Sequence, residues 1–330
     1  MPVSIVVGGQ YGSEGKGKVA HFFAREMEAS FAVRCGGPNS GHTVIDEQGN
    51  ARIFQQLPTA AILPDVKLAI CSGSYIDLDI LRREINETKV GADRLFIDED
   101  AVIITEELKS REAQSGLIGR IGSTGSGTGA AVAARINREE SLLFAKDIPE
   151  LKSFIARVPE ILRDSLDHQE RIIIEGTQGF GLSPLHARHY PYTTSRDTTA
   201  SAFLAETGLS PLDVDDVVLT IRAFPIRVAG NSGPLVDEIN WQTVTEEGGH
   251  SQPIEERTSV TKNIRRVAKF NSKIVKNGMA VNLPTRIILN HMDYILKSHR
   301  DTFVETIEKS INNLIDYIGL GQDILIKRKN

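Results

Sequence analysis

The segment Gly8-Gly-Gln-Tyr-Gly-Ser-Glu-Gly-Lys-Gly-Lys18 directly follows the apolar run Ile5–Val7, which predicts a buried β-strand. Glycines allow the backbone to wrap closely around a phosphate, and the start of the next helix offers free N–H groups. Lys16 and Lys18 add positive charge. The order of strand, glycine-rich loop and helix therefore predicts an α/β fold that binds a phosphate near its beginning.

The loop departs from the usual phosphate-loop pattern G-x-x-x-x-G-K-[ST]. Gln10 stands where the first glycine belongs, and Gly17 stands where a hydroxyl group would bind magnesium. A glycine-rich structural turn with solvated lysines is the alternative to a phosphate site.

Similar apolar runs recur along the chain and are mostly continuous, which is typical of parallel strands covered on both faces by helices. The runs are Ile5–Val7, Leu68–Cys71, Leu95–Ile97, Ile172–Ile174, Val217–Ile221 and Ile287–Leu289. They predict a mostly parallel central β-sheet flanked by helices. Because no repeat or Pro/Ser-rich linker divides the chain, we expect residues 1–330 to form a single domain.

Two helices are predicted from capping patterns. One starts at Asp147, with Pro159 expected to kink or divide it. The other starts at Thr302 and ends at Gly319. Their apolar stripes are Leu151, Phe154, Ile155, Val158 and Leu162 in the first, and Phe303, Ile307, Ile311, Leu314 and Ile318 in the second.

Composition limits the function. The 330 residues are 40% hydrophobic and 25% charged, which suits a globular protein, and the net charge of −5 disfavours nucleic acid or an anionic membrane as a partner. Cys35 and Cys71 lie far apart in the sequence, which argues against a disulfide framework or a cysteine zinc site. With no apolar run of membrane length and no signal-peptide pattern, we expect a cytoplasmic protein, in the host cytoplasm if it is viral.

Five further segments, in order along most of the chain, resemble motifs of adenylosuccinate synthetases, as does the glycine-rich start. These ligases join aspartate to a 6-oxopurine nucleotide. The chain is short for this family. The segments are Gly36-Gly-Pro-Asn-Ser-Gly-His-Thr43, Gly122-Ser-Thr-Gly-Ser-Gly-Thr-Gly129, Glu175-Gly-Thr-Gln-Gly179, Tyr190-Pro-Tyr-Thr-Thr-Ser195 and Arg222-Ala-Phe-Pro-Ile-Arg-Val-Ala-Gly230 with Gly233-Pro234.

The resemblance implies a fold of the adenylosuccinate synthetase type, related to phosphate-loop proteins, and a reaction in two steps. A nucleoside triphosphate gives its γ-phosphoryl group to the purine 6-oxygen, and the aspartate amine then displaces that phosphate at C6. His42 would act as general acid, and Ser13 and Gln178 would be the other catalytic positions. Mg²⁺ would be held at Ser13 and at the carbonyl of Gly41.

The resemblance also assigns the binding residues. The donor nucleotide would contact Gly12, Glu14, Gly15, Lys16, Gly17, Lys18, Gly41, Thr43, Asn290, His291, Asp293, Gly319 and Gly321. The acceptor nucleotide would contact Ser13, Asn39, Thr124, Arg138, Gln178, Thr194 and Val228. Aspartate would bind Ser259, Val260, Thr261 and Arg265, although this stretch also reads as a basic surface loop. Arg138 would reach the neighbouring site of a homodimer; nearby Arg135 competes for that role, and either could be a solvated helix residue.

Three departures from the family pattern concern the substrates. Ser13 replaces the aspartate that removes the acceptor's N1 proton, and a serine hydroxyl is a far weaker base. Asn263 replaces an arginine that reaches toward the ribose 2′-hydroxyl, and His291 replaces a lysine of guanine recognition. A viral branch of the family carries the serine and makes 2-aminoadenine nucleotides. The resemblance therefore implies dGMP and L-aspartate as substrates, with ATP, dATP or GTP as donor and ATP favoured.

Three other functions compete with this interpretation. The chain could be an ordinary adenylosuccinate synthetase that uses IMP and GTP. It could be a nucleotide-binding regulator that lost catalysis with the aspartate, although the retained His42, Gln178 and loop lysines argue against this. A GTPase switch would need a cleaner phosphate-loop pattern and a lysine at His291.

Overall fold

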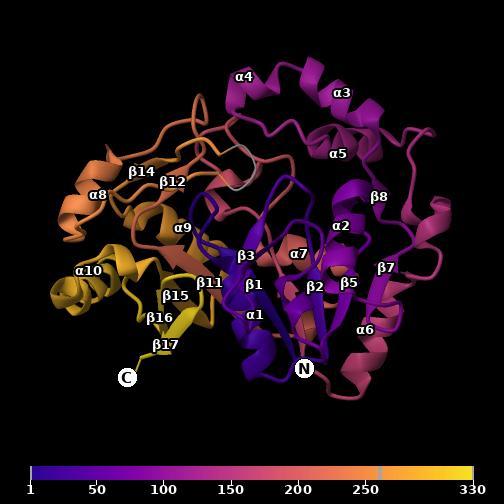
Figure 1. Ribbon diagram of the computed structural model, residues 1–330, viewed down its shortest axis with the longest axis horizontal. Coiled ribbons are helices and arrows are strands. Elements are labelled where there is room, and N and C mark those ends of the chain that lie inside the picture. The colour runs from indigo at the N-terminus through magenta and orange to yellow at the C-terminus, as the bar shows by residue number, and fades with distance from the viewer. Residues whose placement is uncertain (1, 259–261, 329–330) are drawn as a thin grey trace.

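The computed structural model describes residues 2–258 and 262–328. A ten-stranded sheet with the order β17-β16-β15-β11-β1-β10-β2-β5-β7-β9 forms its centre (Figure 1). Neighbouring strands pair in parallel except β16 and β17, which confirms the predicted fold class. The strands are β1 (Val3–Gly8), β2 (Phe31–Arg34), β5 (Lys67–Ile70), β7 (Leu95–Asp98), β9 (Ile155–Ala156), β10 (Ile172–Glu175), β11 (Val214–Arg222), β15 (Arg286–Asn290), β16 (Tyr317–Leu320) and β17 (Ile324–Lys327).

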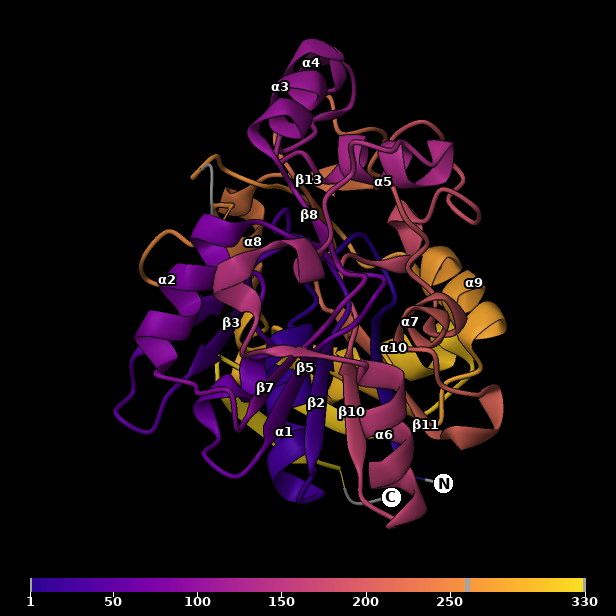
Figure 2. The same cartoon turned by 90° about the vertical axis from the view of Figure 1, so that its right-hand side faces the viewer.

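Helices cover both faces of this sheet (Figures 1 and 2). One face packs against α1 (Lys16–Glu26) and α2 (Leu78–Thr88). The other face packs against α6 (Val158–Asp167), α7 (Ala200–Thr207), α8 (Trp241–Glu247), α9 (Ser272–Asn282) and α10 (Arg300–Ile311). A smaller cluster joins α3 (Glu106–Gln114) and α5 (Thr128–Asn137), next to α4 (Leu117–Ile121).

The two covered faces explain why the strands are continuously apolar. In β1, Ile5 and Val7 belong to one core and Val6 to the other. In β10, Ile172 and Ile174 alternate with Ile173 in the same way. Successive side chains of a strand point to opposite faces, so both sets must be apolar when both faces are buried. Each of the six runs predicted as strands lies in this sheet, except that Cys71 follows the end of β5.

The prediction that a helix begins at Asp147 is wrong. Residues Pro149–Leu151 form a short 3₁₀ turn, Ile155–Ala156 form β9, and α6 begins at Val158. Leu151 belongs to one core and Val158 to the other, so the stripe runs over the edge of the sheet and is not the face of one helix. Pro159 lies in the first turn of α6, where it costs no helix hydrogen bond.

The C-terminal helix was predicted too long. It begins at Arg300 and ends at Ile311, because Asn312 adopts a left-handed backbone conformation with φ of 55°. Ile318 and Gly319 instead lie in β16, which pairs with β15. The predicted stripe therefore joins a helix to the strand that follows it.

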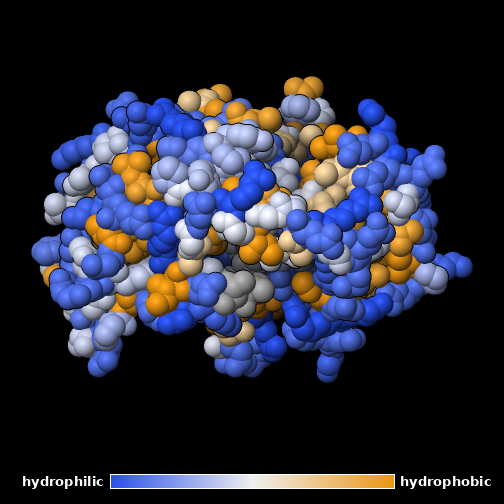
Figure 3. Space-filling model, turned by 90° about the horizontal axis from the view of Figure 1, so that it is seen from above, coloured by the Kyte–Doolittle hydropathy of each residue, from blue (hydrophilic) through white to orange (hydrophobic). Residues whose placement is uncertain are grey.

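The carboxyl ends of five adjacent strands carry most of the quoted motifs. β1 leads into the loop before α1, and β2, β10, β11 and β15 lead into the segments around Gly36, Gly176, Arg222 and Asn290. The segment Gly122–Gly129 does not follow a strand, because it lies between α4 and the first turn of α5. Two small antiparallel sheets accompany the central one. The first pairs β3 (His42–Ile45) with β4 (Ala51–Phe54). In the second, β14 (Arg266–Ala268) lies between β12 (Ile226–Arg227) and β13 (Glu238–Ile239). Seen from above, the surface is mainly hydrophilic with scattered hydrophobic groups (Figure 3). Ligands of open parallel sheets bind at the carboxyl ends of the strands.

The two cysteines are neighbours in space despite their separation in the sequence. Cys35 and Cys71 follow the adjacent strands β2 and β5, their Sγ atoms lie 3.6 Å apart, and both are free and buried. Burial, together with the neighbouring thiol, raises the pKa of the Cys35 thiol. A buried, protonated thiol is a small apolar group, and we assign the pair to the core.

Glu84 of α2 anchors the chain that leads toward the site. Its carboxylate is fully buried and accepts the backbone N–H groups of Gln55, Gln56 and Leu57 at 2.6, 3.0 and 2.8 Å. The next residues form the 3₁₀ helix Thr59–Ile62, which contacts α1. Glu84 thereby fixes a segment that would otherwise leave three buried donors without acceptors.

We therefore expect Glu84→Ala to lower the free energy of unfolding by about 3 kcal/mol, because it leaves those N–H groups unsatisfied. The control is Glu87→Ala in the same helix, where the side chain is 47% exposed and the change should stay within about 0.5 kcal/mol. Urea unfolding at pH 7 measures both. Equal effects of the two substitutions would contradict this role of Glu84.

Candidate active site

The loop between β1 and α1 has the backbone of a phosphate cradle. Gly12, Ser13 and Gly15 adopt positive φ angles of 91°, 57° and 83°. Gly15 also approaches Asn290 so closely that a Cβ atom would lie 2.9 Å from its Nδ2. This backbone turns sharply into the N-terminus of α1, where unpaired N–H groups can face an anion.

Glu14 and Lys16 form a buried ion pair inside the loop. Lys16 Nζ donates to Glu14 Oε2 at 2.7 Å and to the carbonyl of Gln178, and both side chains are at most 2% exposed. Glu14 Oε1 accepts the backbone N–H groups of Gln10 and Gly12 at 3.1 and 2.8 Å. A phosphate that binds Lys16 would therefore compete with the carboxylate of Glu14.

His42 sits in a second buried charge cluster. Its Nδ1 lies 2.5 Å from Glu175 Oε1, and Arg34 Nη1 donates to the same oxygen at 2.9 Å. The other oxygen, Oε2, accepts from the backbone and hydroxyl groups of Thr59 at 2.8 and 2.7 Å. The same Thr59 hydroxyl lies 2.9 Å from the Gly17 carbonyl and can share its one hydrogen with it, so the cluster adjoins the phosphate loop.

Burial controls the charge of this cluster. Burial, and then the charge of Arg34, lower the pKa of His42 to about 4, although Glu175 opposes the shift. Burial alone would raise the pKa of Glu175, but the hydrogen bond from His42 and the charges of His42 and Arg34 lower it to about 2. In the ligand-free protein at pH 7, His42 is neutral and Glu175 is ionised. Anionic phosphates beside the imidazole would raise its pKa toward the range of a general acid.

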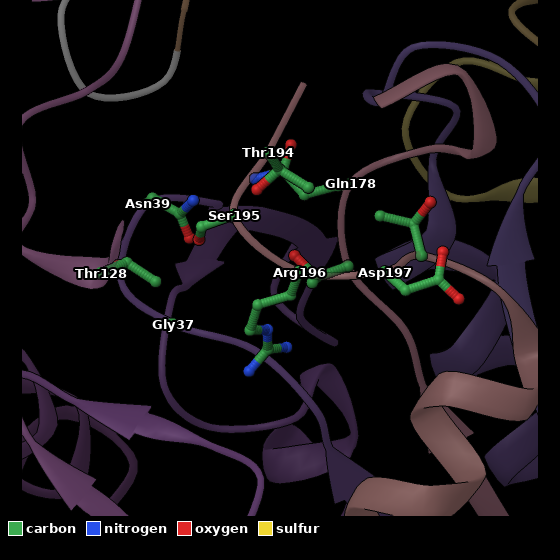
Figure 4. A pocket seen from close by; sticks show the side chains of 10 residues that line it. Gly37, Asn39, Thr128, Gln178, Thr194, Ser195, Arg196 and Asp197 are labelled. Carbon is green, nitrogen blue, oxygen red and sulfur yellow. The ribbon is translucent and has the colours of Figure 1, made fainter. Parts of the chain in front are cut away.

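A polar pocket lies next to the loop (Figure 4). The structure brings together Asn39, Gln178 and Thr194, which the sequence assigned to the acceptor nucleotide. The sequence assigned no role to the other lining residues, although the first four stand in quoted motifs; they are Gly37, Thr128, Thr177, Ser195, Arg196, Asp197 and Thr198.

Four predicted acceptor residues lie outside this lining: Ser13, which belongs to the loop before α1, and Thr124, Val228 and Arg138. Thr124 is exposed and its hydroxyl donates to Ser126 Oγ at 3.2 Å. Val228 packs beside Gly122, where an added Cβ would meet it at 3.4 Å. Arg138 is exposed at the C-terminal end of α5, whereas Arg135 Nη1 donates to the Ser72 carbonyl at 2.6 Å. Of these two arginines, Arg138 is therefore the one placed to reach outward.

The predicted donor-base residues gather around the end of β15 and the β16–β17 turn. Asn290 Nδ2 donates to the Glu14 carbonyl at 2.6 Å, and Asp293 Oδ1 accepts the Gly321 N–H at 3.0 Å. Lys18 Nζ donates to the Gly321 carbonyl at 3.1 Å. Burial lowers the pKa of Lys18 to about 8, although Asp293 and Asp323 oppose the shift.

Gly319 belongs to the same contact, since an added Cβ would lie 1.8 Å from Asn290 Oδ1. No larger residue fits at this position while Asn290 keeps its place. β16 therefore packs closely against Asn290, which in turn donates to the Glu14 carbonyl of the phosphate loop.

The predicted aspartate site is described only in part. Ser259, Val260 and Thr261 lie outside the described residues. Arg265 Nη1 donates to Ser13 Oγ, and its side chain is 12% exposed. The carbonyl of Ser13 accepts from Arg222 Nη1 at 3.0 Å.

Sequence reasoning missed Arg34, Glu175 and Arg222 as parts of the site, although Glu175 and Arg222 stand in quoted motifs. The signal that could have found Glu175 and Arg222 is a charged residue at the end of an apolar strand, which is where such sheets bind ligands.

The phosphate loop, the neighbouring histidine and the polar pocket together define a nucleotide-binding α/β enzyme. The sequence signature of the family described as "Adenylosuccinate synthetase" matches residues 5–146 and 139–301. The adenylosuccinate synthetase of Methanosphaera stadtmanae is 33% identical over 340 aligned positions, covering 98% of this chain and 96% of the relative. That of Methanocaldococcus jannaschii is 38% identical, covering 88% and 82%. The chain belongs to the adenylosuccinate synthetase family and is a C–N bond-forming ligase of purine biosynthesis.

Two solved structures are similar along the whole chain. The succinoaminodeoxyadenylate synthetase of cyanophage S-2L, solved with dGMP and with dATP as an energy donor, is 30% identical with a TM-score of 0.85, covering 99% of this chain and 95% of that one. Adenylosuccinate synthetase from Plasmodium falciparum, 18% identical with a TM-score of 0.87 and full coverage of both chains, shows the same fold. In the described parts of the chain, no helix is long and apolar enough to cross a membrane.

We expect His42 to titrate with a pKa of about 4 in the ligand-free enzyme, because burial disfavours its charged form. Its charge would therefore appear only below pH 5, and adding a nucleoside triphosphate analogue should shift the titration upward. The measurement is histidine-ring ¹H–¹⁵N NMR as a function of pH. Exposed His168, whose pKa is raised mainly by its bond to the Asp164 carbonyl, is the internal control. A His42 titration near pH 6.5 without ligand would contradict the burial argument.

Proposed function

We propose that this ligase joins L-aspartate to C6 of dGMP and forms N6-succino-2-amino-2′-deoxyadenylate, with ATP or dATP as the phosphoryl donor. The product would serve the synthesis of 2-aminoadenine nucleotides. The observation that carries this proposal is Ser13, whose hydroxyl faces the guanidinium of Arg265.

Ser13 supports an acceptor other than IMP for two reasons. The family aspartate at this position acts as a general base, which is worth roughly 10²–10⁴ in rate, and a hydroxyl cannot replace it. The smaller side chain also leaves room for the 2-amino group of guanine. Asn263, in place of the family arginine that reaches toward the 2′-hydroxyl, fits a deoxyribose. The cyanophage enzyme, which was solved with dGMP, supports the same assignment by similarity.

His291 supports an adenine donor. Its Nε2 lies 3.2 Å from the Ser13 carbonyl, so the ring faces the phosphate loop. Burial, and then Arg222, lower the pKa of His291 to about 3, and the ring is neutral at pH 7. The lysine that the family has here would offer a cation to guanine, which a neutral ring turned toward Ser13 does not. ATP or dATP is therefore the donor we favour over GTP.

The chemistry follows the two steps of the family. The O6–Pγ bond forms as the bond from Pγ to the donor's β-phosphate oxygen breaks, with His42 giving a proton to the leaving oxygen. The aspartate amine then attacks C6, the C6–O bond breaks, and inorganic phosphate leaves with the proton that the amine nitrogen loses. Lys16 and the loop N–H groups stabilise the phosphates, and Gln178 and Asn39 orient the acceptor. The N1 proton leaves to a phosphate oxygen or to the substrate aspartate.

Magnesium fits this site at one of its two predicted ligands. The Gly41 carbonyl precedes His42 and is an oxygen donor of the kind that Mg²⁺ prefers. Ser13 Oγ instead contacts cationic Arg265, which a metal ion would have to displace. We propose that Mg²⁺ is held by Gly41 and by phosphate oxygens of the donor, where it would neutralise developing phosphate charge.

The assembly is also a proposal. The exposed position of Arg138 at the end of α5 supports a homodimer in which this arginine reaches the acceptor phosphate of the neighbouring subunit. The central sheet combines strands from β1, near the beginning of the chain, to β17, near its end, which supports a single domain over residues 1–330. We expect the enzyme to work in the cytoplasm, without nucleic acid or membrane partners.

The second candidate function is ordinary adenylosuccinate synthesis from IMP and GTP. The archaeal relatives, which are named adenylosuccinate synthetase, favour it. Under this alternative Ser13 would need another group to take the N1 proton. The regulator without catalysis is not proposed, because the chain belongs to a family of ligases.

An acceptor and donor panel tests the proposal. With Mg²⁺ and aspartate, we expect a succinylated product from dGMP, with ATP or dATP more effective than GTP, and little or none from IMP. Product mass after crossing dGMP, GMP and IMP with ATP, dATP and GTP measures this. Product from IMP alone would establish the ordinary reaction, whereas nucleotide binding without product from any pair would indicate a regulator.

Ser13→Asp tests the residue itself. A carboxylate opposite Arg265 would occupy the space for the 2-amino group and supply the missing base, so kcat/KM should fall at least tenfold with dGMP and rise with IMP. Both acceptors are measured on the same preparation, with the melting temperature as a folding control. Parallel losses with dGMP and IMP would show that Ser13 does not set specificity.

A further inference from the structure

Glu256 occupies the centre of a charge cluster that the two-step mechanism does not use. Its Oε1 pairs with Arg222 Nη2 and accepts the Tyr294 hydroxyl at 3.0 Å. Its Oε2 lies 3.7 Å from Arg265 Nη1 and 3.3 Å from Arg222 Nη1. His291 Nδ1 is 3.9 Å from Oε1. The carboxylate therefore contacts residues from β11, from the end of β15 and from the predicted aspartate loop.

This cluster is short of negative charge. Arg222 and Arg265 are cationic and His291 is neutral. Among the described residues, Glu256 is the one carboxylate that forms ion pairs with these two guanidinium groups, although the charge of Glu14 also acts on both. Burial by itself would raise the pKa of Glu256, but Arg222 above all lowers it to about 2. The buried Nε atoms of Arg222 and Arg265 have no hydrogen-bond acceptor among the described residues. A second carboxylate, brought by a ligand, would complete the cluster.

The cluster also touches Ser13 at three points. Arg265 donates to its hydroxyl, Arg222 donates to its carbonyl, and His291 lies against the same carbonyl. Two of these three residues are held by Glu256 in direct ion pairs. The orientation of these two guanidinium groups around Ser13 thus depends on the carboxylate of Glu256.

We propose that Glu256 is a positioning residue that holds Arg265 ready for a carboxylate of the substrate aspartate. The proposal rests on the assignment of Arg265 to aspartate binding. Glu256 keeps the two like charges of Arg222 and Arg265 side by side before aspartate arrives. When Glu256 is neutral, the guanidinium groups repel each other and the aspartate site loses its geometry, while the nucleotide sites keep theirs.

Glu256→Gln tests this with little change in shape. We expect the KM for aspartate to rise at least tenfold, with kcat at saturating aspartate within threefold of wild type and the acceptor KM within twofold. Such a split indicates loss of ground-state binding, whereas a merely structural defect lowers kcat for every substrate. The matched control is Glu255→Gln, since Glu255 is an exposed neighbour paired only with Arg257 among the described residues, and the aspartate KM should not change.

A double substitution shows whether Glu256 acts through Arg265. Arg265→Met alone should raise the aspartate KM, and adding Glu256→Gln should raise it no further. An unchanged KM in Arg265→Met would overturn the assignment of Arg265 to aspartate. A raised KM in Arg265→Met with an unchanged KM in Glu256→Gln would overturn the role of Glu256 and leave that assignment intact.

Tyr294→Phe provides the same test if Glu256→Gln does not fold. It removes one hydrogen bond to Glu256 without changing any charge, and we expect the aspartate KM to rise about threefold with unchanged kcat. The assays use whichever acceptor gives product, so dGMP use and the role of Glu256 are tested separately. An unchanged aspartate KM in a folded Tyr294→Phe enzyme would overturn the proposal.

Discussion

The carboxylate of Glu175 is the contact on which the arrangement of the site depends. It stands at the end of β10, is 1% exposed, and binds Arg34 from β2, His42 from β3 and Thr59 from the 3₁₀ helix beside α1. Four segments therefore meet at one buried charge. Removing one partner of such a cluster would leave the others charged and unpaired away from water, which costs several kcal/mol.

Buried or largely buried carboxylates with cationic partners surround the phosphate loop. Glu14 pairs with Lys16 inside the loop, Glu175 holds Arg34 and His42 on one side, and Glu256 holds the arginines on the other. Each cation is therefore oriented before an anionic ligand binds. Preorganised groups need little rearrangement when charge develops on a transferring phosphoryl group, which is the main source of catalysis in such reactions.

The sequence predicted the sheet well and the helix ends poorly, for one physical reason. A strand such as Ile172–Ile174 is buried on both faces, so its apolar run ends where the strand ends. Apolar spacing does not reveal which core a residue enters, and Leu151 and Val158 enter different ones. Motifs predicted Gln178 and His42 as site residues. Glu256 instead contacts Arg222 and Tyr294, which lie 34 and 38 residues away, and the contact of Arg265 with Ser13 spans 252 residues, so no local pattern reveals them.

The substitution at Ser13 changes the charge balance at the point where these clusters meet. An aspartate here would add a second carboxylate to Arg222, Arg265 and Glu256 and make that group neutral. With serine the group keeps one excess positive charge, beside the place proposed for the purine. Such a charge stabilises a purine that has lost its N1 proton and a substrate that brings its own carboxylates. In the proposed reaction, this stronger field would offset part of the loss of the general base, and the proton acceptor would come from the substrates themselves.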